Sequence, residues 1–333
     1  MYRITLRAVA NLSLLSAFLI AFTHAMAGPE HGTAHNDVPL WQLTPEQIAA
    51  QVNVVRAGAD LTPKSWPDGA KVAVSFSFDV DTEPVWMGFQ KQTSPSYMSR
   101  GEYGARVGMP RVLDLLGKHK IPATFFIPAV SMLLHPEIVQ ELRKHPEYEI
   151  GFHSYVHENP LTLNETQERS VYEKAMAIFV DQVGEKPAGF RSAAWDLTPS
   201  TIKLVQEMGF VYESSMMADD RPYQLIAEGK DTGLVELPVE WILDDWPYFQ
   251  VSWPSKHVAM RNADDVYSIW KEEFDGAYEE GTAYILTMHP QVIGHRYRMQ
   301  MLDRLITYMK TKTGVWFATH EEIARYVKAA AAE

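Results

Sequence analysis

The sequence contains no cysteine among its 333 residues. This absence excludes disulfide bonds, zinc sites with cysteine ligands, iron–sulfur clusters and thiol nucleophiles. Any metal ion must therefore bind histidine, aspartate or glutamate side chains. Catalytic groups are limited to those residues together with hydroxyl, lysine and arginine side chains. Glycine and proline, at 19 and 20 residues, are too few for a collagen-like or low-complexity chain.

Positive charge is also scarce, because 30 lysines and arginines stand against 42 aspartates and glutamates and leave a net charge of −12. Nucleic-acid binding needs a basic surface that displaces counterions, so we expect no nucleic-acid partner. An anionic membrane surface would repel the chain as well. The 46% hydrophobic content is typical of a globular protein with a buried core. The length fits one large α/β domain or two ordinary ones.

One long apolar run is present, and it lies at the N-terminus. Arg3 and Arg7 precede the apolar segment 8–22, and Ala25-Met26-Ala27 then supplies a small-residue cleavage site. We expect residues 1–27 to be a cleaved export signal peptide, which places the mature protein in the periplasm or outside the cell. An uncleaved anchor helix is the alternative, but the run is short for a membrane span and polar residues interrupt it. Contact with a membrane is then expected only through the signal peptide.

After a polar N-terminal linker or extension over 28–65, apolar strands alternate with helical segments. Strands are predicted over 71–78, 123–127, 149–152, 210–212, 234–237 and 283–287, and helices over 106–118, 137–145, 264–278 and 298–311. Three further helices are predicted to begin after the N-cap residues Asn164, Thr198 and Thr319. Strand followed by helix, repeated about seven times, predicts a parallel sheet with helical crossovers in a single catalytic domain over 66–333.

Polar side chains follow the predicted strands, where apolar or turn residues would serve packing equally well. In parallel α/β folds the reactive groups gather at the carboxyl ends of the strands. Carboxylates and imidazoles together suit a metal site without thiolates. The residues found at these positions are Asp79, Asp81, Glu83, His153, His157, Arg191, Asp244, Asp245 and His289.

Two pairs among these residues are weak signals when taken alone. His153 and His157 have the spacing that puts two imidazoles on one helical face or one tight loop. Ser154 stands where a His-Glu-x-x-His protease needs glutamate, and two ordinary packed histidines are the alternative interpretation. Asp79 and Asp81 are separated by one residue, and we expect their side chains to point in different directions, so that both need not bind one ion.

Five motifs in order make a much stronger signal. They are Ser77-Phe-Asp79-Val-Asp81, His153-Ser-Tyr-Val-His157, Gly189-Phe-Arg191-Ser-Ala-Ala-Trp195, Leu243-Asp244-Asp245-Trp246-Pro247 and Leu286-Thr-Met-His289-Pro290. From about Val72 to its end, the chain resembles the NodB-homology polysaccharide deacetylases, a group like carbohydrate esterase family 4. The resemblance implies a distorted (β/α) barrel of about seven parallel strands.

The resemblance also implies a metal ion. The family's metal triad falls on Asp81, His153 and His157, which would hold one divalent ion, with zinc expected and cobalt, nickel or iron(II) as alternatives. Such a triad leaves an open position, so the ion can polarise an amide carbonyl and lower the pKa of a bound water.

The remaining roles follow from the same resemblance. The catalytic base falls on Asp79, and Arg191 falls on the arginine that holds it. The general acid falls on His289, supported by Asp244 or Asp245, and the sequence leaves open which of the two serves. Contacts to the substrate are expected from Glu83, Tyr155, Trp195 and Trp246.

The first motif departs from the common family form, in which two aspartates are adjacent and a glycine follows. Here Val80 separates them, and Thr82-Glu83 replaces the glycine. This variant resembles a sub-branch with allantoinase-like and cyclic-imidase-like proteins beside a peptidoglycan deacetylase, a sub-branch that often forms homotetramers. We expect N-deacetylation of an N-acetylated glycan. Ring-opening hydrolysis of a small cyclic imide or ureide is the alternative, and an inactive carbohydrate-binding barrel is a third interpretation.

Of the histidines outside the motifs, four lie at or near the ends of predicted helices. They are His119, His135, His145 and His320, and we expect them to be ordinary surface residues.

Overall fold

The computed structural model describes residues 38–252 and 256–332. The expected signal peptide, 1–27, and the first part of the expected extension, 28–37, lie outside the described residues. Within the described ranges, no helix combines the length and the apolar character that a membrane span needs.

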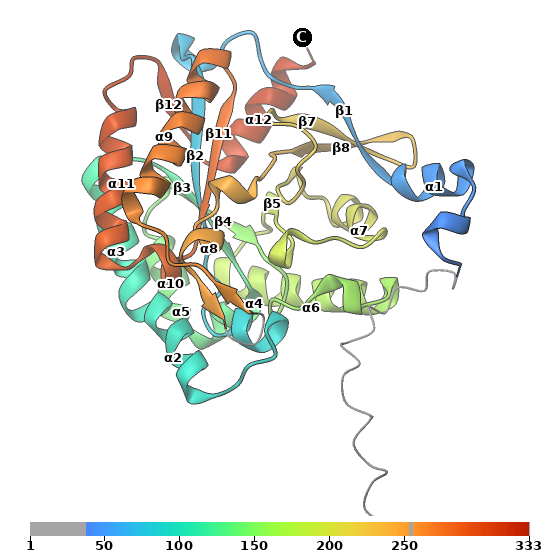
Figure 1. The fold of residues 1–333 in the computed structure, drawn as a ribbon, viewed down its shortest axis with the longest axis horizontal. Coiled ribbons are helices and arrows are strands. Elements are labelled where there is room, and N and C mark those ends of the chain that lie inside the picture. Colours follow the sequence, from blue (N-terminus) through green and yellow to red (C-terminus); the bar gives the residue numbers. More distant parts are fainter. Residues whose placement is uncertain (1–37, 253–255, 333) are drawn as a thin grey trace, which may run out of the picture.

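A curled sheet forms the centre of the molecule (Figure 1). Its strands follow one another in space in the order β1-β7-β8-β6-β5-β4-β3-β2-β11, and β12 pairs with β2 beside this path. Their bounds are β1 Val55–Asp60, β2 Val72–Asp79, β3 Ala123–Ile127, β4 Tyr148–Phe152, β5 Gly189–Phe190, β6 Tyr212–Glu213, β7 Tyr223–Ala227, β8 Lys230–Glu236, β11 Ala283–Met288 and β12 Val315–Phe317. A separate two-stranded ribbon joins β9 Val251–Ser252 to β10 His257–Val258.

Most neighbouring strands of the main sheet run parallel, as the alternation of strands and helices predicts. Parallel pairing links β11, β2, β3, β4, β5, β6 and β8, and β12 pairs parallel with the start of β2. A parallel bridge between Asp244 and Thr287 then connects the segment after β8 to β11, which brings the two ends of the parallel series together. The carboxyl ends of the strands therefore face one side of a distorted barrel.

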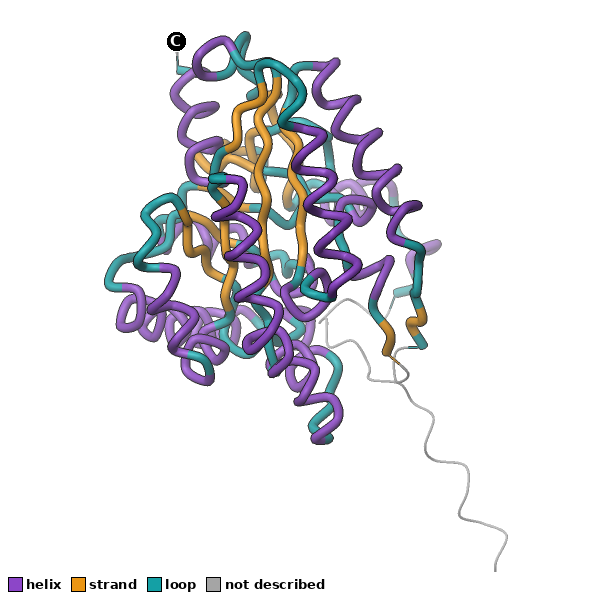
Figure 2. The backbone as a smooth tube through the Cα atoms, turned by 90° about the vertical axis from the view of Figure 1, so that its left-hand side faces the viewer, coloured by secondary structure: helices purple, strands orange, loops and turns teal. Residues whose placement is uncertain are grey.

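Helices cover the outside of this sheet, as the tube view shows (Figure 2). Their bounds are α1 Pro45–Val52, α2 Pro95–Tyr103, α3 Met109–His119, α4 Ala129–Leu134, α5 Pro136–Leu142, α6 Glu165–Val183, α7 Thr201–Met208, α8 Trp246–Phe249, α9 Ala263–Glu280, α10 Pro290–Ile293, α11 Arg296–Met309 and α12 His320–Ala330. Short helical turns add η3 Val85–Phe89, η4 Gly104–Gly108, η6 Ala193–Trp195 and η7 Trp241–Leu243.

The alternation of β2 separates the hydrophobic core from a polar barrel interior. Val72, Val74, Phe76 and Phe78 are buried in the main apolar core shared with the surrounding helices. The intervening residues Ser75, Ser77 and Asp79 are also buried, and strand geometry sends them to the opposite, inner face. A second apolar cluster fills the interior and includes Ala318, Ile323, Ala324 and Val327 from α12 and the turn before it. The last helix therefore helps to fill the barrel.

Two of the three predicted helix N-caps are confirmed. Capping boxes join Asn164 to Gln167 and Thr319 to Glu322, as predicted. The predicted N-cap at Thr198 is wrong, because α7 begins at Thr201. The Thr198 hydroxyl accepts from the Ser200 backbone N–H at 3.1 Å and donates to the buried carboxylate of Glu168 at 2.6 Å, so it lies in a turn just before the helix.

The sheet edge differs from the prediction. Part of the expected N-terminal extension forms β1, which pairs antiparallel with β7, and β7 pairs antiparallel with β8. β1 is rich in glycine, alanine and charged residues and is almost fully exposed, so no period-two apolar pattern marks it as a strand. Helix α1 precedes it, and none of its residues is buried.

Candidate active site

The predicted site residues come together at the carboxyl ends of the parallel strands. Asp79 is the last residue of β2, and His153, Arg191 and His289 directly follow β4, β5 and β11. Asp81 lies two residues beyond Asp79 and is fully buried. Residues that are far apart in the chain thus meet because parallel strands end at one edge.

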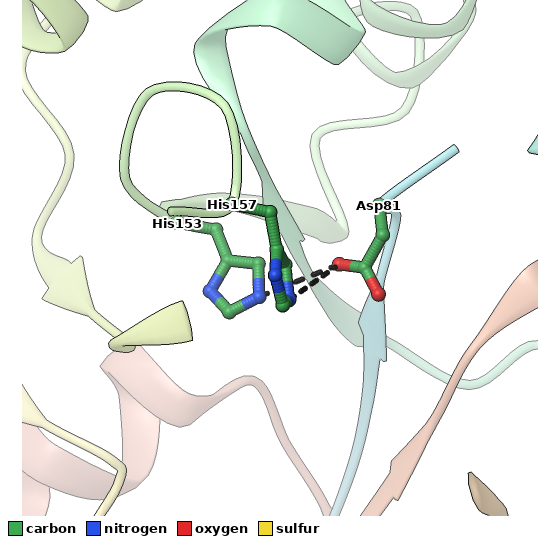
Figure 3. Close-up of side chains that lie close together, drawn as sticks. All are labelled: Asp81, His153 and His157. Atoms are coloured by element: carbon green, nitrogen blue, oxygen red, sulfur yellow. Dashed lines mark ion pairs between the residues drawn. The ribbon is translucent and has the colours of Figure 1, made fainter. Parts of the chain in front are cut away.

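Asp81, His153 and His157 point toward one another (Figure 3). His153 Nε2 lies 3.4 Å and His157 Nε2 3.7 Å from the same Asp81 oxygen, Oδ1. Both histidines come from the loop after β4, in which Ser154 and His157 have positive φ angles. These left-handed conformations are costly for residues other than glycine and are typical of functional loops. The turn they make brings the second imidazole back toward the first.

Hydrogen bonding fixes which nitrogen of His153 faces the group. A carbonyl oxygen can only accept, so His153 Nδ1 donates to the Arg191 carbonyl at 2.8 Å. In the neutral imidazole, Nε2 then carries the lone pair. Buried His153 Nε2 and Asp81 Oδ1 have no hydrogen-bond partner among the described residues. One carboxylate and two imidazoles with converging atoms fit a divalent metal ion, and the backbone partner of His153 Nδ1 is the support that ligating histidines use.

For Asp81 and His157, the electrostatics favour the protonation states that bind a cation. Burial alone would raise the pKa of Asp81, but the imidazoles of His157, His153 and His289 outweigh it and lower that pKa to about 2. Burial lowers the pKa of His157 to about 4. At neutral pH, Asp81 is therefore ionised and His157 is neutral, as metal ligands must be.

Asp79 lies beside this group and is held from the other side. Arg191 Nη1 donates to Asp79 Oδ1 at 2.8 Å, while Asp79 Oδ2 lies 3.8 Å from His153 Nε2. The side chains of Asp79 and Asp81 therefore converge on one imidazole, and the prediction that they diverge is wrong. Side chains two residues apart along an extended chain lie on the same face, as Ser75, Ser77 and Asp79 do in β2, so strand geometry itself brings Asp81 to the side of Asp79.

His289 completes the site together with two aspartates. Its Nδ1 lies 2.7 Å from Asp245 Oδ1, and its backbone N–H donates to Asp245 Oδ2 at 3.0 Å. Asp244 Oδ1 is more distant, at 3.6 Å from Nδ1, and accepts from the Trp246 backbone instead. Of the two candidates, Asp245 thus makes the close contact. His289 Nε2 lies 3.7 Å from Asp81 Oδ2 and is aimed at the metal group.

Burial and the neighbouring charges shift the pKa values of His289 and Asp244. Burial would lower the pKa of His289, but Asp244 and Asp245 outweigh it and hold that pKa well above its ordinary range. Burial, with the nearby charge of Asp245, raises the pKa of Asp244 to about 8 despite the opposing effect of His289. A protonated imidazole held by a buried carboxylate is suited to donate a proton.

A cavity of about 230 Å³ opens onto these groups. Its apolar wall includes Trp195 and Trp241, whose ring centroids are 4.4 Å apart, and Trp246, whose ring centroid is 5.1 Å from that of His289. The complete lining is Asp79, Asp81, Val85, Phe89, Gln90, His157, Ala194, Trp195, Trp241, Asp244, Trp246 and His289. The arrangement can bind a small group between aromatic side chains and expose it to a metal, a base and an acid.

Two residues expected at the substrate do not line this cavity. Glu83 Oε2 pairs with His135 Nε2 at 2.9 Å, and the Tyr155 ring lies 4.0 Å from Lys174 Nζ. A larger cavity of about 1010 Å³ lies at the opposite, amino ends of the strands, and its lining includes Tyr148 and Glu149 but no predicted site residue.

Sequence reasoning missed two side chains near the site. Gln291 Nε2 donates to Asp81 Oδ2 at 3.3 Å. The prediction that His320 lies at the surface is wrong. The residue is fully buried, and its Nε2 lies 3.2 Å from Arg191 Nη2. The inward serines of β2 were the available signal, because such a polar row inside a barrel needs polar partners.

Comparisons with known proteins agree with this geometry. Residues 99–212 match the family model described as polysaccharide deacetylase. The chain is 29% identical over 280 residues to the peptidoglycan deacetylase of Helicobacter pylori, which covers 76% of this chain and 95% of that protein.

Solved structures are similar as well. A crystal structure described as a polysaccharide deacetylase from Mycobacterium smegmatis matches this chain with a TM-score of 0.76 and 33% sequence identity. The match covers 82% of this chain and 96% of that chain. The allantoinase Puue has a TM-score of 0.69 and 26% identity, over 82% and 94% of the two chains. These matches confirm the distorted barrel that the sequence predicts.

Proposed function

The chain belongs to the polysaccharide deacetylase family, and on this basis we propose that it is a metal-dependent hydrolase that removes acetyl groups from an N-acetylated glycan. The observation that carries the proposal is the convergence of an Asp-His-His group, an arginine-held aspartate and an aspartate-held histidine on one cavity. Metal-assisted hydrolysis of an amide uses an electrophilic ion, a base for the water and an acid for the departing nitrogen.

We propose that Asp81, His153 and His157 hold one divalent ion, with zinc as the expected metal. When bound, this ion would supply polarisation of the acetyl carbonyl and a lowered pKa for the attacking water. The unpartnered Asp81 Oδ1 and His153 Nε2 support this assignment. The hydrogen bond from His153 Nδ1 to the Arg191 carbonyl would keep that imidazole in the required tautomer.

Asp79 is the proposed base. Arg191 binds one of its oxygens and leaves Oδ2 directed toward the metal group, where the attacking water must lie. The buried guanidinium therefore holds the base in place.

His289 is the proposed acid. Asp245 holds its Nδ1, so that Nε2 points to the cavity and can protonate the departing amine. An amine leaves poorly without this proton. The presence of Asp79, Arg191 and His289 together argues against an inactive binding barrel. Binding alone requires no base, no arginine that holds the base and no acid.

For the substrate we propose a bacterial wall glycan. The similarity to the peptidoglycan deacetylase of Helicobacter pylori supports this choice, and the tryptophan wall offers a surface on which a sugar ring can stack. Export through the signal peptide at 1–27, which lies outside the described residues, would bring the enzyme to that glycan.

Ring-opening hydrolysis of a small cyclic imide or ureide is the second candidate. The similarity to an allantoinase favours it, and so does the cavity of about 230 Å³, a volume smaller than that of most ligand pockets. The same ion, base and acid would serve, because this reaction also breaks a C–N bond.

One experiment separates the two candidates. The zinc-loaded enzyme is assayed for acetate release from peptidoglycan fragments and, in parallel, for ring opening of succinimide-like and hydantoin-like compounds. The proposal expects acetate release that is lost in Asp79→Asn. Ring opening without acetate release would replace it with the second candidate.

A further inference from the structure

The guanidinium of Arg191 is fully buried and uses every hydrogen atom it can donate. An arginine side chain has five N–H donors. Nε donates to the Ser214 carbonyl at 2.9 Å, and Nη1 donates to Ser77 Oγ and to Asp79 Oδ1, both at 2.8 Å. Nη2 donates to Ser214 Oγ at 2.8 Å and faces His320 Nε2 at 3.2 Å. His320 is therefore the acceptor for the fifth donor.

This contact determines the tautomer of His320. Because Arg191 can only donate, His320 Nε2 must present a lone pair. The proton then lies on Nδ1, which is 2.7 Å from Ser75 Oγ. His320 is the first residue of α12, where the helix N-terminus disfavours a positive charge. Burial, together with the charge of Arg191, holds the pKa of His320 well below its ordinary value.

The surroundings leave His320 little freedom to move. Its backbone N–H donates to Thr124 Oγ1 at 2.9 Å, and its ring packs against Phe126 with centroids 5.5 Å apart. The Arg191 guanidinium lies over the same Phe126 ring at 4.1 Å. The imidazole and the guanidinium are thus held against one another by a shared aromatic side chain and by α12.

We propose that His320 is a positioning residue for the reaction: as a neutral imidazole it accepts from Arg191 Nη2 and so fixes the angle at which Arg191 presents Nη1 to Asp79. The inference rests on the proposed function, because it takes Asp79 as the base. If the acceptor is lost, a buried N–H of Arg191 has no partner, and the guanidinium must turn or shift to find one. Either movement misaligns Asp79, whose reactive oxygen has to lie within hydrogen-bond reach of the water.

The first test compares two substitutions at this position. Asparagine in His320→Asn can still contact Ser75 but lacks an acceptor where Nε2 stands, whereas the longer glutamine in His320→Gln can place its amide oxygen there. We expect His320→Asn to lower kcat by about 10- to 100-fold with KM and bound metal nearly unchanged, because a misplaced group costs turnover rather than binding. His320→Gln should recover most of the loss.

The control is His119→Asn, which removes a histidine that pairs with Asp303 on the outer helices and should leave kcat unchanged. Wild-type kcat in His320→Asn would overturn the inference. An equal loss in His320→Gln would also overturn it, because the loss would then not follow the acceptor.

A second measurement does not depend on turnover. The ¹⁵N chemical shifts of an imidazole distinguish a protonated from a bare nitrogen, and His320→Gln identifies the signals by their disappearance. We expect His320 to carry its proton on Nδ1 only between pH 5 and 8. A proton on Nε2 would overturn the inference even if His320→Asn fails to fold. If the wild-type enzyme releases no acetate from any glycan, the proposed function fails, while this measurement still decides the placement of His320.

Discussion

At the scale of single residues, the site separates two aspartates that the chain places only one residue apart. Asp79 has one oxygen bound by Arg191, whereas Asp81 faces two imidazoles and has a buried oxygen without a hydrogen-bond partner among the described residues. A carboxylate already bound by a guanidinium can take up a proton on its free oxygen. An unpartnered carboxylate among imidazoles is instead suited to a cation.

The first prediction concerns Asp79. Asp79→Asn keeps the size of the side chain and can keep the contact with Arg191 through its amide oxygen, but it cannot accept the water's proton. We expect kcat to fall by about 10²–10⁴-fold, the usual contribution of a general base, while bound metal stays at the wild-type level. Metal analysis of the purified variant and an acetate assay check this. An empty metal site in Asp79→Asn would reverse the assignment of the two aspartates.

Asp81→Asn should behave in the opposite way. Loss of the anionic ligand lowers metal affinity, so the variant should purify with little metal and regain part of its activity when excess zinc is added. A titration of activity against zinc concentration measures the effect. A full equivalent of metal after dialysis would contradict the proposed ligand set.

At the scale of elements, close backbone packing positions the loop that carries His289. A Cβ atom at Gly108, the last residue of η4, would overlap the carbonyl of Pro290 at the start of α10. Pro290 directly follows His289, so the contact between these two helical segments fixes the position of His289, the proposed acid.

The corresponding variant is Gly108→Ala. The added methyl group must push α10 away, so we expect a loss of roughly 1–3 kcal/mol in the free energy of unfolding and a lower kcat. Gly117→Ala in α3 is the matched control, because a Cβ there meets no atom within 4 Å. The control should gain about 0.5–1 kcal/mol from its higher helix propensity and keep its activity. Equal denaturation midpoints for the two variants would contradict this account.

A buried glutamate links β4 to the start of α12. Glu149 Oε2 accepts from the Glu321 backbone N–H at 2.9 Å and from Thr124 Oγ1 at 2.8 Å, and Oε1 accepts from Tyr212 at 2.7 Å. Burial raises the pKa of Glu149 to about 7 from an ordinary value of 4.5, despite these hydrogen bonds. The folded state thus holds a proton that the unfolded state releases at lower pH.

The sign of the pH dependence follows from this shift. The contribution of Glu149 to stability is complete below pH 4.5 and is lost as the pH rises toward 7, by an amount on the order of 1–3 kcal/mol. Glu149→Gln should remove this component, so the difference in unfolding free energy between the variant and the wild type should change between pH 5 and 8. Glu185→Gln, an exposed residue at the same cavity, is the control. A difference for Glu149→Gln that is independent of pH would refute the shift.

Elements also show what the sequence could and could not predict. The starts of α6 and α12 were predictable, because a capping box involves residues three positions apart. β1 was not, because its partner β7 lies far along the chain and its own residues show no apolar alternation. The inward serines of β2 indicated that buried polar partners were needed, but the choice of His320 as one of them depends on how α12 enters the barrel interior.

At the scale of the whole molecule, the parallel barrel explains why the site was the most predictable part. Residues after β2, β4, β5 and β11 have to meet once the strands are parallel, whatever the intervening helices do. The sequence therefore identified the side chains that gather, while the choice of Asp245 over Asp244 needed the distances to His289. The positions of Glu83 and Tyr155 outside the cavity lining also depend on loop conformation, which has no simple sequence signal.

The most direct test of the central claim is acetate release from an N-acetylated glycan as zinc is returned to chelator-treated enzyme. A single site formed by Asp81, His153 and His157 predicts that activity is absent without metal, rises with added zinc and reaches its plateau at about one equivalent. Acetate release that is equally fast in the metal-free and the zinc-loaded enzyme would contradict the proposed mechanism.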